Sequence, residues 1–233
     1  MRQIEPSPSH SVPWTVRDVW LGGVFLGLWL AILIAFSFLL RFLSLDLDPG
    51  LIVSLAELLL LGPAWWLTVR KYRVGWETLG LRGFKGGMIG LGCGLMLLSF
   101  GFNLVYSLFL ALFNLRAQVD LVPVFAELSS PWWLLVGGVV VAPVVEEVFF
   151  RGFVFAGLCR RYDWRKAALI SSALFALIHL QPTAFLPIFI LGYIFAYLYH
   201  RSDSIWPAIV MHVSTNALGL GAAYMLAKAD IVR

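Results

Sequence analysis

The residues best suited to chemistry lie between Val141 and Gly152, where two carboxylates and an arginine interrupt a long apolar run. Glu146 and Glu147 are adjacent, and Arg151 follows Glu147 by four residues. A charged side chain inside a membrane-spanning helix costs about 2.5–3.5 kcal/mol on insertion scales. Three charges so close together therefore indicate either a structural ion pair or a catalytic site.

Two histidines and one amide in later apolar runs complete a set that could hydrolyse a peptide bond. His179 follows Phe175 by four residues, and Asn216 follows His212 by four, so each pair shares one face of a helix. A glutamate can take a proton from water, and a histidine can position that water or protonate the leaving amine. A second histidine and an amide can donate hydrogen bonds to the oxyanion. Phe175 is expected to be a packing residue.

The two glutamates are expected to have different tasks. Glu147 and Arg151 can pair along one helix face, which would keep Glu147 ionised and fix the rotation of the helix. Glu146 points about 100° away from Glu147 around the helix. Pro143 precedes Glu146 by three residues and is expected to kink the helix, opening room beside Glu146.

A zinc site is the alternative use of these side chains. Glutamate and histidine are zinc ligands, and Asn216 would be a weaker one. The chain has no His-Glu-x-x-His run, which is the signature of helix-borne zinc proteases. The residues alone leave both alternatives open.

The composition is typical of an integral membrane protein with one membrane domain. The 233 residues are 61% hydrophobic and 13% charged, and the mean hydropathy is +0.88, whereas soluble domains are about 25% charged. No soluble module for nucleic-acid binding is expected. Cys93 and Cys159 lie far apart in apolar runs and are expected to be buried free thiols.

About seven membrane spans are expected, within a range of six to eight, after a short tail at residues 1–18. The fifth and sixth apolar runs are short, which suits elements covered by other helices. Glu57 in the second run and Asn103 in the third are expected to be contacts within the bundle. The seven runs are Val19–Leu40, Leu51–Val69, Gly86–Phe113, Trp132–Cys159, Ala167–Leu180, Ala184–Tyr199 and Ile205–Ala227.

The distribution of basic residues predicts the orientation in the membrane. The tail and the loops after the second, fourth and sixth runs carry twelve Lys and Arg residues, and the opposite side carries four. Because basic loops stay in the cytoplasm, the N-terminus is expected inside and the C-terminus outside. The predicted location is a bacterial inner or plasma membrane.

Three motifs resemble those of the CPBP family, the CAAX-type and bacteriocin-processing intramembrane proteases also called Abi proteins. The motifs are Glu146-Glu147-x-x-x-Arg151, Phe175-x-x-x-His179 and His212-x-x-x-Asn216, in that order on successive elements. The stretch from Trp76 to Arg82 also resembles one common in bacterial members. Each motif alone is weak, but three in order within apolar runs are specific.

The resemblance implies an all-α, polytopic transmembrane bundle enclosing a hydrophilic cavity, with one protease-like domain over residues 19–233 and a catalytic core over 132–227. It implies that Glu146 activates water with His179 as its partner, and that His212 and Asn216 stabilise the oxyanion. Glu147 and Arg151 would support them. We favour a metal-free mechanism with no cofactor, because Glu146, His179 and His212 form a lean ligand set for zinc.

The expected activity is therefore that of a CAAX-type membrane endopeptidase acting on a membrane-associated protein or peptide in the lipid bilayer. Two other functions compete with this one. Intramembrane Glu and His side chains also mark proton and ion pathways in transporters, although the sequence shows no inverted repeat. A membrane immunity or interaction protein without enzymatic activity could keep the same fold.

Overall fold

A computed structural model describes residues 12–45, 47–128 and 130–231, and these residues form helices and no strands. This confirms the predicted all-helical fold. The α-helices are α1 (Val16–Phe42), α2 (Pro49–Leu59), α3 (Leu61–Trp65), α4 (Gly87–Ala111), α5 (Val122–Glu127), α6 (Trp132–Val136), α7 (Ala142–Glu147), α8 (Ala156–Leu158), α9 (Trp164–Ile178), α10 (Phe185–Ser202) and α11 (Trp206–Ile231). A short 3-10 helix covers Trp76–Leu79.

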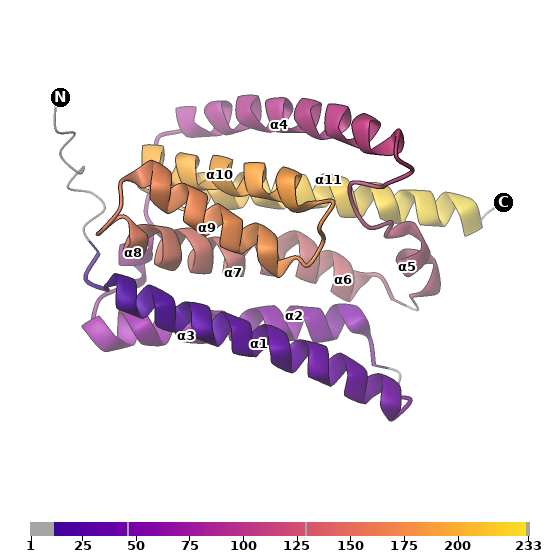
Figure 1. Ribbon diagram of the computed structural model, residues 1–233, viewed down its shortest axis with the longest axis horizontal. Helices are drawn as coiled ribbons and strands as arrows, with labels where there is room; N and C mark the ends of the chain where they lie inside the picture. Colours follow the sequence, from indigo (N-terminus) through magenta and orange to yellow (C-terminus); the bar gives the residue numbers. More distant parts are fainter. Residues whose placement is uncertain (1–11, 46, 129, 232–233) are drawn as a thin grey trace.

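Five helical stretches of the described chain are long and apolar enough to cross a membrane. They are Val16–Phe42, Gly50–Arg70, Gly87–Ala111, Trp132–Leu158 and Trp206–Ala229. Each of the seven predicted runs is largely helical, and the two outside this set are α9 and α10, where the apolar runs are short. Figure 1 shows the long helices side by side, as expected of a membrane bundle.

The stretch Trp132–Leu158, which comprises α6, α7 and α8, runs through the centre of the bundle (Figure 1). It packs against α1, α2 and α3 on one side and against α9, α10 and α11 on the other, and α4 covers α10 and α11. All residues of Val148–Phe155 are buried, including the aromatic side chains of Phe149, Phe150 and Phe153. The segment that carries the predicted chemistry is thus the core of the fold.

Two parts of this central helix are wound as π-helix, at Gly137–Val141 and at Val148–Phe155. In a regular α-helix the Pro143 ring would clash with the backbone carbonyl four residues earlier. The wider π-helical segment Gly137–Val141 makes room for the proline. In the second segment, side chains from elsewhere bond to the main chain. Trp14 Nε1 donates to the Phe153 carbonyl at 3.0 Å, and Ser171 Oγ donates to the Phe150 carbonyl at 2.9 Å.

The start of the chain differs from the expected boundary of the tail. Residues 1–11 of the predicted tail lie outside the described residues, but Trp14 is fully buried and α1 begins at Val16. Asp18 anchors this start, because its Oδ2 accepts hydrogen bonds from the Thr15 backbone N–H at 2.8 Å and from Tyr72 Oη at 2.7 Å. The first helix is therefore longer than the uncharged run suggested.

The two cysteines are free, as predicted, but Cys93 is not buried. Cys159 is half-buried, whereas Cys93 is exposed on α4. The buried side of α4 includes Gly92 and Met96, which face α10 and α11. Cys93 lies about 100° around the helix from Gly92 and so points outward.

Candidate active site

The central helix delivers both glutamates to one buried position. Glu146 is 6% exposed and Glu147 is fully buried, in the last turn of α7. Arg151 Nη1 donates to Glu147 Oε1 at 3.0 Å, and both side chains are fully buried. The ion pair predicted from the four-residue spacing is therefore present, and it neutralises two charges inside the apolar core.

Arg151 is held by α10, an element for which the sequence predicted no site residue. Its Nη2 donates to the Gly192 carbonyl at 3.1 Å. Its guanidinium carbon lies 4.4 Å from the centre of the Phe175 ring and 5.2 Å from that of Phe195. The one hint in the sequence of this close contact is Gly192, the single glycine of the run Ala184–Tyr199. In the structure, a Cβ at this position would stand 3.2 Å from Arg151 Nη2.

His212 links the two glutamates from α11. Its Nδ1 lies 2.9 Å from Glu147 Oε1, and its Nε2 lies 3.6 Å from Glu146 Oε2. Glu147 is ion-paired with Arg151, and an ionised carboxylate can only accept hydrogen bonds. The Nδ1 of His212 therefore carries a proton and donates it to Glu147. The ring stacks on Phe195 at 4.9 Å, which fixes the direction in which Nε2 faces Glu146.

His179 lies just beyond the end of α9, where it caps the helix. Its Nδ1 is 2.7 Å from the Phe175 carbonyl, and since a carbonyl only accepts, Nδ1 carries the proton. A neutral His179 therefore presents an unprotonated Nε2. Glu146 lies beside His212. The partnership of Glu146 with His179 that the resemblance implies stays a prediction.

Phe175 joins the three motifs. Its ring centre is 4.9 Å from that of His179 and 5.7 Å from that of His212, and Arg151 lies over its face. The predicted packing role of Phe175 is therefore confirmed. The three motifs meet around one aromatic ring although they belong to three separate helices.

Asn216 points to the central helix one turn further along α11. Its Nδ2 donates to the Gly138 carbonyl at 2.7 Å, within the π-helical segment Gly137–Val141. This bond fixes α11 against the central helix on the same face as His212. The amide oxygen of Asn216 takes no part in this bond.

Glu57 adds a third carboxylate beside the cluster. It is 8% exposed on α2, which packs against α7. Its Oε2 is buried without a hydrogen-bond partner. Sequence reasoning assigned Glu57 only a bundle contact, because no motif residue accompanies it.

The residues of the alternative zinc site are not arranged to hold a metal. Among residues 12–45, 47–128 and 130–231, no three His, Cys, Asp or Glu side chains are close enough together to bind a metal ion. The set of Glu146, His179 and His212 is therefore not assembled as a ligand triad in this structure.

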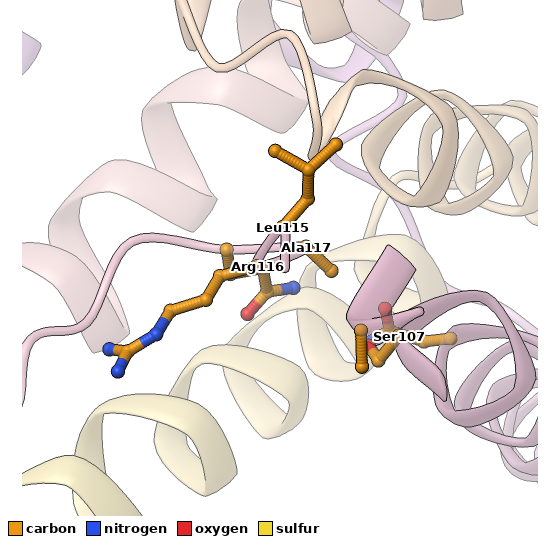
Figure 2. A pocket seen from close by; sticks show the side chains of 7 residues that line it. Ser107, Leu115, Arg116 and Ala117 are labelled. Carbon is orange, nitrogen blue, oxygen red and sulfur yellow. The ribbon is translucent and has the colours of Figure 1, made fainter. Parts of the chain in front are cut away.

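Two pockets lie away from this cluster. One, of about 310 Å³, lies between the end of α4 and the loop that follows, and Figure 2 shows the side chains that line it. Asn103 lines it, and its Oδ1 is buried without a hydrogen-bond partner. The Arg116 side chain there pairs with Asp120 at 2.7 Å. The other pocket lies at the end of the second span. The predicted hydrophilic cavity around Glu146 stays a prediction.

Comparison with known proteins finds a family model that matches the part of the chain carrying the cluster. Residues 128–218 match the family model of type II CAAX prenyl endopeptidases of the Rce1-like kind. The chain is 32% identical over 103 residues to YdiL of Bacillus subtilis, a candidate membrane peptidase, and 32% identical over 88 residues to the UPF0177 protein YxdF of Lactococcus lactis.

These alignments cover only part of each protein. They include 44% of this chain and 40% of YdiL, and 37% of this chain and 48% of YxdF. No solved structure matches the chain significantly. All three sequence motifs fall within the matched residues 128–218.

Proposed function

Because residues 128–218 match the family model of Rce1-like type II CAAX prenyl endopeptidases, we propose that this integral membrane protein is an intramembrane endopeptidase. The observation that carries the proposal is the cluster of Glu146, Glu147 and His212 in the bundle core, with Nε2 of His212 3.6 Å from Glu146. Its substrate is a membrane-associated protein or peptide.

Glu146 is the proposed general base. It has no hydrogen bond to Arg151, which is committed to Glu147 and Gly192, so its carboxylate is free to take a proton from a water molecule. The water then attacks the scissile carbonyl, the C–N bond breaks, and the proton passes to the leaving amine. The unprotonated Nε2 of His179 suits it to orient the water or to relay this proton.

His212 and Asn216 are the proposed oxyanion donors. Glu147 holds Nδ1 of His212, which leaves Nε2 as the face directed at the site. To donate to an oxyanion, Nε2 must carry a proton in addition to Nδ1, and two flanking carboxylates can balance that charge. Asn216 would turn its amide from the Gly138 carbonyl toward the substrate.

The mechanism is metal-free, with the catalytic core on residues 132–227. The N-terminus faces the cytoplasm of a bacterial inner membrane, as the basic loops predict.

The direct test is cleavage by the purified full chain in lipid bilayers. Membrane-anchored peptides should yield products whose masses differ from the substrate by hydrolysis of one bond. His179→Ala should abolish this cleavage while the thermal unfolding temperature stays close to that of the wild type. Cleavage at the wild-type rate by His179→Ala would remove His179 from the mechanism. Ion flux without cleavage of any peptide would favour a transporter instead.

A further inference from the structure

A basic pocket at the end of the second span is separate from the proposed active site. It has a volume of about 270 Å³ and is lined by Trp66, Arg70, Lys71 and Arg73. Arg70 is the last residue of the apolar stretch Gly50–Arg70, so the pocket lies where the hydrocarbon region gives way to lipid headgroups. The exposed Trp66, at 59%, is typical of that depth.

The charges of the pocket are available to a ligand. Lys71 forms an ion pair with Asp18 and remains partly exposed, and this hydrogen bond raises its pKa, so it stays protonated. Arg70 and Arg73 are both exposed, and no acidic partner accompanies either within the described part of the chain. The pocket therefore presents concentrated positive charge of the kind that phosphate groups bind.

The end of this helix brings the cations together. Arg70 and Arg73 are three residues apart, a spacing that places side chains side by side on a helix. The helix continues through the π-helical segment Trp66–Arg70 as far as Tyr72, and Arg73 follows it in a left-handed conformation with φ of 55°. The Val74 N–H then bonds to the Val69 carbonyl at 3.3 Å. Glycine is the usual residue at such a turn, so an arginine there points to a use for its side chain.

An exposed apolar stripe leads from the bilayer interior to the pocket. Leu59, Gly62 and Trp66 follow one another by three and four residues and so lie on one face of the helix. Leu59 is 67% exposed, and a Cβ placed on Gly62 would meet no atom within 4 Å. Gly62 therefore has open space beside it and lies between two exposed apolar residues, which suits one acyl chain.

We propose that this pocket binds one anionic phospholipid, with its phosphate between Arg70 and Arg73 and an acyl chain along Leu59, Gly62 and Trp66. The topological rule for basic loops explains why cations occur on this side, but it does not explain why three of them line one pocket together with an exposed tryptophan. A free phosphate would use the cations alone, whereas a phospholipid uses the stripe as well. The proposal does not depend on the proteolytic activity.

Native mass spectrometry of the purified full chain tests this assignment. Phosphatidylglycerol and phosphatidylcholine with identical acyl chains are titrated into the wild type and into Arg70→Gln/Arg73→Gln. Each cation contributes about 1 kcal/mol to binding an anionic lipid, so the double variant should bind the first phosphatidylglycerol roughly 30-fold more weakly. Phosphatidylcholine should bind weakly to both proteins.

The matched control is Arg161→Gln/Arg165→Gln, which removes two exposed cations from the other basic loop. This control should bind phosphatidylglycerol like the wild type. An equal loss in both double variants, or equal binding of the two lipids, would overturn the site. Thermal unfolding of each variant checks that the fold is intact.

Gly62→Phe separates a lipid from a free phosphate. It should weaken phosphatidylglycerol binding several-fold, because the ring occupies the open space at Gly62 where the acyl chain would lie, and leave binding of soluble glycerol phosphate unchanged. If glycerol phosphate binds as tightly as phosphatidylglycerol and Gly62→Phe has no effect, the ligand is a free phosphate and the lipid assignment is wrong.

Discussion

At the scale of single residues, the buried charges are divided between support and chemistry. Glu147 accepts from Arg151 at 3.0 Å and from His212 at 2.9 Å, so it orients two other side chains. Glu146 accepts no hydrogen bond from Arg151, and its carboxylate faces His212 Nε2. The spacing in the sequence predicted the Glu147–Arg151 pair because i, i+4 contacts are local. It could not predict the His212 contact, which depends on how α11 is placed.

Glu147→Gln should destabilise the protein by about 3–5 kcal/mol, because it leaves Arg151 buried without its counter-charge. Thermal unfolding in a fixed detergent measures the change. The double variant Glu147→Leu/Arg151→Leu should be more stable than Glu147→Gln, since it removes both charges. An unfolding temperature of Glu147→Gln equal to that of the wild type would show that the pair is not supporting the fold.

Glu57→Leu should be neutral or stabilising, because the buried Oε2 of Glu57 has no hydrogen-bond partner that the change would remove. Ser54→Ala on the same helix is the reference. Ser54 Oγ lies 3.2 Å from the Trp133 carbonyl, so its loss should cost about 1 kcal/mol. A loss of unfolding free energy of 2 kcal/mol or more in Glu57→Leu would contradict this expectation and would mean that the Glu57 carboxylate holds a partner.

At the scale of helices, the site depends on how closely α10 approaches the central helix. Gly192 allows its carbonyl to reach Arg151 Nη2 and leaves room for Phe175. The sequence predicted each helix from its apolar run but gave no reason to place α10 at the site. That contact arises from packing between helices far apart along the chain, and a glycine alone is a weak signal of it.

Gly192→Ala should destabilise the protein by about 1–3 kcal/mol, because the added Cβ would stand 3.1 Å from Phe175 Cδ1 and 3.2 Å from Arg151 Nη2. Gly94→Ala on α4 is the matched control. A Cβ at Gly94 meets no atom within 4 Å, so this change should be neutral or stabilise the helix by up to about 1 kcal/mol. Equal unfolding temperatures for the two variants would contradict the close approach of α10.

At the scale of the whole molecule, the helical bundle follows from the composition and the order of apolar runs, whereas the central position of Trp132–Leu158 is visible only in the structure. The start of α1 was less predictable, because Asp18 and Trp14 are polar or amphipathic residues that the fold nevertheless buries. Asp18 is tolerated there because Lys71, Tyr72 and Thr15 surround it. Such compensation from distant residues cannot be read from a local stretch.

The orientation in the membrane is testable with single cysteines in a chain lacking Cys93 and Cys159. We expect Gln118→Cys to react with a membrane-impermeant maleimide in intact cells, because the loop after α4 faces outward. Asp163→Cys should react only after the cells are broken, since its loop carries the basic residues that stay inside. The opposite pattern of labelling would invert the assigned topology.

Glu146 is the central residue of the proposed hydrolysis, because it activates the attacking water. The most direct measurement is the rate of peptide cleavage by Glu146→Gln in lipid bilayers, together with its unfolding temperature. Since Glu146 has no hydrogen bond to Arg151, the variant should fold like the wild type. Its rate should fall by at least about a hundredfold, because glutamine cannot accept the proton. A stable Glu146→Gln protein that cleaves at the wild-type rate would contradict the account.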